Sequence, residues 1–290
     1  MNGAHRWFLA AAGNQSADDG TTADYRDAAD YSHVRFNTII NSGAASSDVY
    51  GVAIKSDGTQ FYHVGTDELL EAYNLSTAYN INTHGNRVAA TSLYSINSGN
   101  GALTSIFFKP DGTALYTTDV DDNVYQYSLS TAWDITTISY VRAKDLGNVL
   151  NPNGIYFSPD GTKFFFTDWR RDYIYRYDMT TAWDISTSTR TGASRALDIS
   201  ATIRERAPRA VWLSDDGLKV YVVGTYRDTI YSFDLSTAWD ITEIQGGADS
   251  SLYIGNKETV PLSMCFSSDG RYIYIGGGTG NGVDQYDRGA

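Results

Sequence analysis

The sequence predicts an all-β protein, a five-bladed β-propeller with four antiparallel strands per blade. An N-terminal strand that pairs with the C-terminal blade is expected to close the ring. Three observations support this. Asp-Gly pairs recur every 49 to 56 residues, a second motif follows four of the five pairs, and the last unit stops before its own copy of that motif. Four short strands in a unit of about 50 residues are typical of a propeller blade, because β-helices and leucine-rich repeats have shorter periods.

The repeat is marked by its turns and by a corner motif. The turns begin at Asp57, Asp111, Asp160, Asp216 and Asp269. The corner motif reads LSTAYNI, LSTAWDI, TTAWDI and LSTAWDI, and its copies begin at residues 75, 129, 180 and 235. Since the repeats run from about residue 50 to the end of a 290-residue chain, we expect one closed unit rather than two domains.

The third unit shows the expected strands most clearly. Residues 154–158 form a short apolar run that ends at a Pro-Asp-Gly hairpin turn. Residues 163–167 return as a second strand, and residues 173–177 alternate in polarity as a third. A weaker and more polar fourth strand is expected between about residues 188 and 198, after the corner motif.

Comparison of the five units indicates which positions are structural. Five residues after each turn Asp stands an aromatic residue: Tyr62, Tyr116, Phe165, Tyr221 and Tyr274. Three residues before it stands a large apolar residue: Ile54, Phe108, Phe157, Leu213 and Phe266. Sixteen or seventeen residues after it stands another aromatic residue: Tyr73, Tyr127, Tyr177, Phe233 and Tyr286. Positions filled alike in five copies predict packing between neighbouring blades, and each such side chain stabilises the fold by roughly 1.5–3 kcal/mol when buried.

The fifth unit predicts how the ring closes. It stops at residues 285–288, where its corner motif should begin. Near the N-terminus, Thr22–Tyr25 and then Ser32–Arg35 resemble the corner and fourth strand of the second unit. We therefore expect residues 22–290 to form the propeller, with the N-terminal segment completing blade five and leaving no free sheet edge. Residues 1–21 lie outside the repeat and are expected to form an arm or tether.

Composition excludes several classes of protein. The formal net charge of −12 disfavours nucleic acid and anionic membranes as partners of the whole surface. No apolar run approaches the roughly 18 residues of a membrane span, and residues 7–13 resemble a signal-peptide core only at its short limit. The single cysteine, Cys265, excludes an intramolecular disulfide and is expected to be a buried structural thiol in an apolar strand.

The turns and corners also carry a resemblance. The Asp-Gly-Thr turn followed by an apolar and an aromatic residue resembles WD40-like and YVTN-type propeller repeats. The LSTAWDI corner resembles a repeat of marine phage and bacterial proteins. The resemblance covers residues 22–290 and implies a virion or an extracellular, cell-surface location. The five-bladed ring is similar to tachylectin-type lectins, but the chain has no lectin-specific motif.

The two faces of such a propeller should differ in role. The Asp-Gly turns and corner motifs share one face, where we expect Ser and Thr hydroxyls to satisfy local backbone groups and Trp to cover blade junctions. A sugar site repeated once per blade is the alternative there. The opposite face carries turns and connections that differ in every unit. Function usually resides in loops that vary on a constant scaffold, so this variable face is the expected site.

An arginine-rich cluster stands out on the variable face of blades three and four. The candidate binding residues are Trp169, Arg170, Arg171, Arg204, Arg206, Arg209, Tyr226 and Arg227. Guanidinium groups next to aromatic faces suit carboxylates, phosphates or acidic sugars. The alternative is a solvated, partly salt-bridged surface or a subunit contact. Its neutralising residues would be Asp168, Asp172, Glu205 and Asp228.

Metal binding and catalysis have weaker support. Asp119, Asp121 and Asp122 have calcium-like spacing but lack the Gly and distal Glu of an EF-hand loop, so we expect a solvated hairpin turn and no cofactor, with Ca²⁺ as the alternative. The sequence contains no nucleophile elbow, P-loop or zinc motif. The residues expected to line the tunnel are apolar: Val52, Ile106, Ile155, Val211 and Met264. Asp48 is the acid expected at the tunnel entrance.

These observations favour a non-enzymatic binding or structural module. The leading hypothesis is a virion- or surface-associated propeller for assembly or host attachment, with residues 1–21 docking on other virion or surface proteins. A glycan or an acidic ligand would bind the variable face. The first alternative is a lectin-like carbohydrate-binding propeller. The second is a propeller hydrolase or lyase, which the apolar tunnel residues disfavour.

Overall fold

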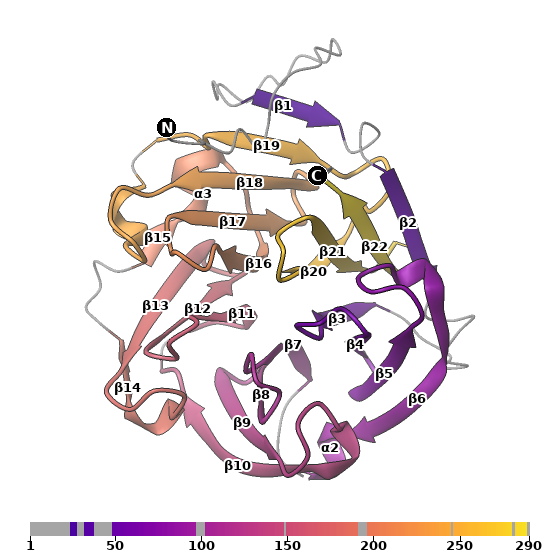
Figure 1. Cartoon of the computed structure of the whole chain (residues 1–290). Coiled ribbons are helices and arrows are strands. Elements are labelled where there is room, and N and C mark those ends of the chain that lie inside the picture. The colour runs from indigo at the N-terminus through magenta and orange to yellow at the C-terminus, as the bar shows by residue number, and fades with distance from the viewer. Residues whose placement is uncertain are drawn as a thin grey trace, which may run out of the picture.

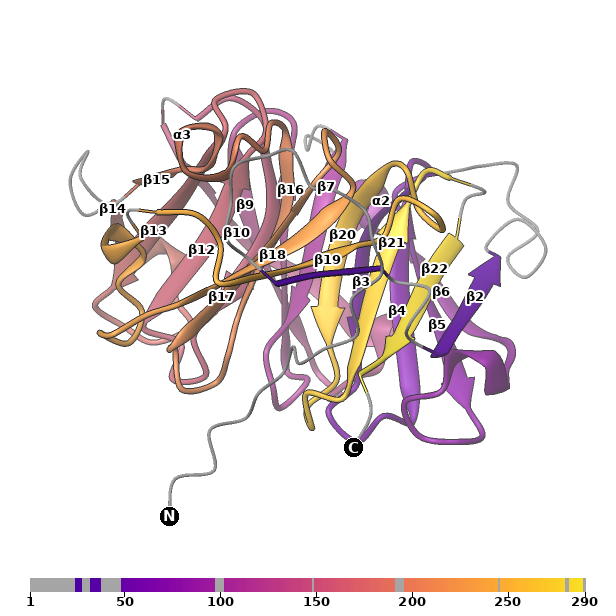
Figure 2. The ribbon, with the colours of Figure 1, turned by 90° about the horizontal axis from the view of Figure 1, so that it is seen from above.

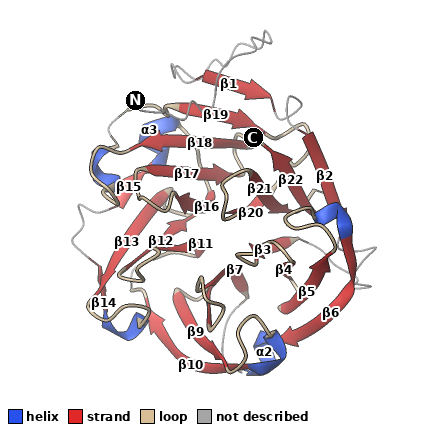
Figure 3. Cartoon of the chain, viewed as in Figure 1, coloured by secondary structure: helices blue, strands red, loops and turns tan. Residues whose placement is uncertain are grey.

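The computed structural model is a ring of five β-sheets around a central axis, seen along that axis in Figure 1. It confirms the predicted all-β, five-bladed propeller, and the helices of the described residues are short (Figure 3). The structure describes residues 24–27, 32–37, 48–96, 102–147, 149–190, 196–244, 246–279 and 282–288. The predicted arm, residues 1–21, lies outside this part of the chain.

Within each blade the strands follow one another from the axis outward (Figure 1). Blade 1 contains β3 (Val49–Ile54), β4 (Gln60–Gly65), β5 (Leu69–Leu75) and β6 (His84–Ser92). Blade 2 contains β7 (Leu103–Phe108), β8 (Ala114–Asp119), β9 (Asn123–Leu129) and β10 (Ile138–Asp145). Blade 3 contains β11 (Pro152–Phe157), β12 (Lys163–Asp168) and β13 (Tyr173–Met179), with the outer strands β14 (Ser188–Arg190) and β15 (Ala196–Asp198). Blade 4 contains β16 (Pro208–Leu213), β17 (Lys219–Gly224), β18 (Thr229–Asp234) and β19 (Ser250–Tyr253).

Blade 5 joins the two ends of the chain. Its inner strands are β20 (Pro261–Phe266), β21 (Tyr272–Gly277) and β22 (Gly282–Asp287). The fourth strand is β2 (Ser32–Asn37), which runs antiparallel to β22 with Ser32 opposite Asp287 and Asn37 opposite Gly282. This pairing confirms the predicted closure of the ring by an N-terminal strand. It gives the outer edge of β22 a backbone partner, which an open last blade would lack.

The segment before β2 differs from the prediction. Residues 22–25 resemble a corner motif, but β1 (Asp24–Asp27) is a strand that pairs in parallel with β19, with Asp24 opposite Ser250 and Asp27 opposite Tyr253. Figures 1 and 2 show β1 outside β19 in blade 4 and β2 outside β22 in blade 5. The prediction was wrong here because the outer edge of β19 offers unpaired backbone groups to the passing chain. The N-terminal segment therefore extends blade 4 before it completes blade 5.

The Asp-Gly turns and the corner motifs lie on one face, as predicted, and we call it the turn face. Each turn Gly of the first four blades has a positive φ and lies under the aromatic ring of its own corner. A Cβ atom on Gly112 would stand 2.3 Å from the Trp133 ring, so the ring requires a glycine beneath it. The corner Asp then caps a short 3₁₀ helix, as Asp134 does at η3 (Ile135–Thr137) by accepting a hydrogen bond from the amide of Thr136.

The corners also lock neighbouring blades together. In blades 1, 2 and 5 the tyrosine five positions after the turn Asp donates a hydrogen bond from its hydroxyl to the corner carbonyl of the next blade. The bonds join Tyr62 to Trp133 (2.9 Å), Tyr116 to Trp183 (2.7 Å) and Tyr274 to Tyr79 (2.6 Å). All five aromatic residues at this position are buried, which confirms the predicted packing between blades.

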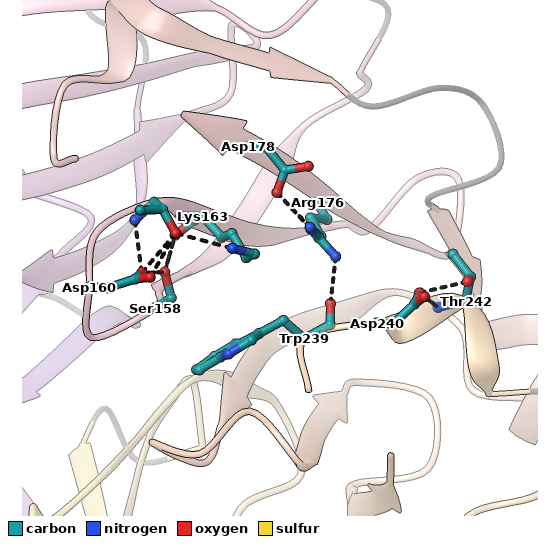
Figure 4. A network of polar contacts seen from close by, with 9 residues as sticks. Ser158, Asp160, Lys163, Arg176, Asp178, Trp239, Asp240 and Thr242 are labelled. Carbon is teal, nitrogen blue, oxygen red and sulfur yellow. Dashed lines mark hydrogen bonds and ion pairs between the residues drawn. The ribbon is translucent and has the colours of Figure 1, made fainter. Parts of the chain in front are cut away.

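Blade 3 reaches the same contact by another route. Phe165 has no hydroxyl, and its ring stacks on Trp239 of blade 4 with centroids 6.3 Å apart. Arg176 supplies the missing donor: its Nη1 lies 3.0 Å from the Trp239 carbonyl, while its Nε donates to Asp178 (Figure 4). The junction between blades 3 and 4 therefore keeps its hydrogen bond although the repeat residue has changed.

The other repeated positions also form the core. The aromatic residues of the third strands are all buried, as are the apolar residues before the turns except Ile54, which is partly exposed. Cys265 is buried and free, as predicted. Among the described residues no helix has the length and apolar character needed to cross a membrane.

Candidate functional site

On the variable face, opposite the turn face, each turn between second and third strands needs an acceptor for its amides. Asp119 ends β8 and accepts from the amides of Asp121 and Asn123 at 3.0 and 2.9 Å. Asp168 occupies the same place in blade 3 and accepts from the amides of Arg170 and Arg171. A buried carboxylate is thus the structural support of these two turns.

Blades 4 and 5 place a glycine where blades 2 and 3 have this aspartate. A Cβ atom on Gly224 would stand 2.6 Å from Oε1 of Glu205, and one on Gly277 would stand 2.2 Å from Cδ of Glu258. The two glutamates come from the connections that precede their blades, and they enter the space left by the missing side chains. Glu258 Oε1 accepts from the amides of Val260 and Thr279 at 2.8 and 2.9 Å. Blades 4 and 5 therefore have a carboxylate at the same place as blades 2 and 3, but it comes from a different position in the repeat.

These contacts bear on the suggested calcium residues. Asp119 is fully buried, and its Oδ2 also accepts from the Tyr125 hydroxyl at 2.7 Å. Asp122 accepts from the amide of Asn151 at 3.1 Å. In the described ranges no group of three or more His, Cys, Asp or Glu side chains is arranged to hold a metal ion. Two of the three suggested carboxylates, those of Asp119 and Asp122, thus accept hydrogen bonds from backbone amides.

Glu205 is an acid of the variable face whose pKa is strongly raised. Its Oε1 accepts from the amides of Arg206 and Tyr226 at 3.1 and 3.0 Å, and Oε2 has no hydrogen-bond partner among the residues that the structure describes. Burial raises the pKa of Glu205 from its ordinary 4.5 to about 7, against the lowering effect of the amides and of the Arg227 charge. The group therefore titrates near neutral pH.

Stability should consequently fall as pH rises across this range. Between pH 4.5 and about 7 the folded protein holds a proton on Glu205 that the unfolded chain has released, so this stabilisation is present below pH 4.5 and lost through pH 7. Glu205→Gln keeps the oxygen acceptor but cannot ionise. From pH 4.5 to 8 we expect wild type to lose about 3 kcal/mol of unfolding free energy more than this variant. Urea denaturation at both pH values measures it, and equal losses would contradict it.

The structure brings the predicted arginine cluster together. Residues 204–209 lie between two turns and are bonded to both. The amide of Ala207 donates to Asp172 at 2.8 Å, and Glu205 accepts from the amide of Tyr226. Three segments far apart in sequence thus form one surface on blades 3 and 4.

Two aromatic rings organise the guanidinium groups of this cluster. Arg209 and Arg170 lie over the Trp169 ring, with their Cζ atoms 4.4 and 5.3 Å from its centroid. Arg206 and Arg227 flank Tyr226 at 5.8 and 6.0 Å. Tyr226 is 59% exposed and Arg206 is exposed as well, whereas Arg227 is partly buried.

The predicted neutralising acids do not pair with these arginines. Asp168, Asp172 and Glu205 accept from backbone amides instead. None of the six arginines forms an ion pair within 4.0 Å of another residue that the structure describes. This is unlike Arg142, Arg176 and Arg271, which each pair with an aspartate elsewhere in the ring. The guanidinium groups of the cluster are therefore not held in close ion pairs with the described residues, although the charges of Arg171 and Arg227 act on Asp168 and Glu205.

Arg209 extends the cluster toward the axis. It belongs to the innermost strand β16, and burial lowers the pKa of its guanidinium while the nearby Tyr50 and Asp48 raise it. Within the described ranges its buried Nε has no hydrogen-bond partner, and neither has the buried Nε1 of Trp169. Asp48, the predicted tunnel-entrance acid, thus lies within electrostatic reach of the cluster.

The turn face holds a cavity that the sequence patterns did not indicate. It has a volume of about 770 Å³ and is lined by the first strands and turns of all five blades. Two of the five predicted tunnel residues, Val52 and Ile106, line this cavity. In every blade, however, the residue that directly follows the predicted tunnel residue lines it. These wall residues are Ala53, Phe107, Tyr156, Trp212 and Cys265. Their unequal size within the repeat is the signal that could have revealed the cavity.

Comparisons with known proteins identify no family for this chain. No family model matches the chain, so the likeness to WD40-like repeats stays a resemblance, and no curated protein matches it. One similar solved structure is a functionally unknown protein from Desulfotomaculum acetoxidans, with 15% identity and a TM-score of 0.45. The alignment covers 79% of this chain and 62% of that one, so this chain spans less than two thirds of its length.

Proposed function

We propose that this protein is a non-enzymatic binding module that attaches to an acidic partner through the arginine cluster of its variable face. The partner would present carboxylates, phosphates or acidic sugars, as a component of a virion or a cell surface. The supporting observation is a set of six arginines that form no ion pair with the residues the structure describes, four of which lie beside two aromatic rings.

The charge distribution supports this role. The chain carries a formal net charge of −12, so a local concentration of unpaired cations directs anionic groups to one place on the ring. Guanidinium forks bind carboxylate and phosphate oxygens in pairs, and stacking on an aromatic ring reduces the freedom that they lose on binding. Attachment by such a surface needs no reacting group.

The test measures binding of two anionic polymers, polyglutamate and heparin, to the full chain by calorimetry at low salt. We expect Arg170→Ala/Arg206→Ala to weaken binding about tenfold or more. The reason is that several guanidinium groups bind anionic groups of the same polymer chain, so their contributions to the binding free energy add up. The control Lys55→Ala/Lys109→Ala removes two cations from the turn face, where each is paired with a turn Asp. It should bind as wild type does.

Three outcomes separate the hypotheses. Equal weakening in both double variants would mean that net charge alone drives binding and would reject the arginine cluster. Binding of neutral glycans that neither variant alters would favour the lectin-like alternative. Turnover of a glycan by the wild type would favour the hydrolase or lyase.

A further inference from the structure

The side chains that line the cavity of the turn face differ in size from one side of the cavity to the other. Blades 2, 3 and 4 contribute the large rings of Phe107, Tyr156 and Trp212, whereas blades 1 and 5 contribute the small Ala53 and Cys265. Since the five positions are equivalent in the repeat, a purely structural role would favour one residue type. The small side chains instead leave room opposite an aromatic wall.

The Tyr156 ring meets its two neighbours at steep angles. Tyr156 and Trp212 have centroids 4.9 Å apart and ring planes at 62°, and Phe107 and Tyr156 are 5.6 Å apart at 77°. With this arrangement, the faces of neighbouring rings are directed to the cavity from two directions. The faces of aromatic rings carry negative potential and attract cations, most strongly when two or more converge.

The polar groups of the cavity favour the same charge. Its lining includes the carboxylates of Asp215, Asp216, Asp234 and Asp269 against the cations Lys219 and Arg288. Asp216 and Asp269 each accept from turn amides, and Lys219 pairs with Asp234. Arg288 lies over the Phe266 ring and donates to the carbonyl of Gly270. These groups are therefore engaged in the structure.

Asp215 and Tyr156 are the exceptions. Asp215 stands at the rim, exposed, with no hydrogen bond or ion pair to another residue of the described ranges. The other blades have Ser56, Pro110, Pro159 and Ser268 at its position, so only blade 4 adds a charge there. Tyr156 is 2% exposed, and its hydroxyl makes no hydrogen bond within the described part of the chain. This unpartnered hydroxyl belongs to a residue that lines the cavity, where a ligand can form a hydrogen bond with it.

We propose that this cavity binds a small organic ammonium ion. Its charged nitrogen would lie between Asp215 and the rings of Tyr156 and Trp212, and its apolar body would fill the rest of the cavity. A volume of about 770 Å³ suits a small molecule rather than a single water-sized ion. The site is separate from the arginine cluster: it lies on the opposite face and has the opposite charge preference.

The test titrates the full chain with benzyltrimethylammonium by calorimetry and compares neopentylbenzene, its uncharged analogue of the same shape. We expect the cation to bind with a Kd in the micromolar to millimolar range and about tenfold more tightly than the neutral compound. Asp215→Asn should weaken cation binding about fivefold to tenfold and leave the neutral compound unaffected. Trp212→Ala should weaken both.

The control is Asp121→Asn, which removes one exposed carboxylate from the variable face. It should bind the cation as wild type does. Equal affinity for the cation and the neutral compound would overturn the proposal in favour of a plain apolar cavity. Equal weakening by Asp215→Asn and Asp121→Asn, or no heat with the cation at millimolar concentration, would also overturn it. Melting curves identify variants that fail to fold, and Asp215→Asn, at an exposed position, keeps the proposal testable if Trp212→Ala does not fold.

Discussion

Replacing Gly154 by alanine is expected to cost about 4 kcal/mol of unfolding free energy or more. Gly154 lies in β11, where its φ is +44°. A Cβ atom there would stand 2.4 Å from Cα of Ala210 and 2.5 Å from the carbonyl oxygen of Arg209. Both are backbone atoms of the neighbouring blade, so no side chain can turn away to make room. The innermost strands of blades 3 and 4 would have to separate.

The control for this prediction is Gly147→Ala. Gly147 also has a positive φ, +55°, but no described atom lies within 4 Å of the position of its Cβ. It should cost only the backbone strain, about 1–2 kcal/mol. Urea denaturation of the two variants measures the difference. Equal losses would show that conformation alone, and not the approach of the two blades, requires the glycine. Because Arg209 is part of the contact, Gly154→Ala should also weaken binding of an acidic partner.

The second large effect concerns the exchange between Glu205 and Gly224. Gly224→Asp would place a carboxylate against Oε1 of Glu205 and add a second buried negative charge, and Glu205→Val would leave buried backbone amides without an acceptor. Each change alone should cost about 2–4 kcal/mol. Together they reproduce blade 3, where Asp168 supports its turn and Val149 stands at the position equivalent to Glu205.

The double variant should therefore be much closer to wild type than the sum of the single changes. We expect a coupling energy of about 2 kcal/mol or more from a double-mutant cycle. Denaturation of all four proteins at pH 8, where Glu205 is ionised, gives this value. Additive losses would mean that the two residues do not share one structural task. The same exchange can be made in blade 5 with Glu258 and Gly277, which are equivalent residues.

Particular residues show how far sequence patterns reach. The aromatic residues five positions after each turn Asp were expected between blades, and Tyr62, Tyr116 and Tyr274 do bond across these junctions. The corner tryptophans were expected to be structural, and Trp133 covers the glycine of its own turn. Such contacts are predictable because they repeat: each follows from a spacing within one unit and from the next unit being a copy.

Other contacts depend on how the ring closes. Residues 22–25 resemble a corner motif. The chain from Asp24 onward nevertheless pairs in parallel with the outer edge of β19. The arginines were expected on one edge, but their lack of ion pairs depends on Asp168 and Glu205 turning to backbone amides. Neither outcome follows from spacing, because both are decided by which free backbone groups lie nearby in space.

The sequence by itself thus determined the number of blades, the three inner strands of each, the shared face of turns and corners, and the closure of blade 5. These follow from local turn chemistry and from a period that every copy repeats. Only the tertiary structure decided that Ala53, Phe107, Tyr156, Trp212 and Cys265 surround one cavity with Asp215 at its rim. The physical reason is that the five side chains come from strands far apart in the chain, and they meet only when the sheets have packed around a common axis.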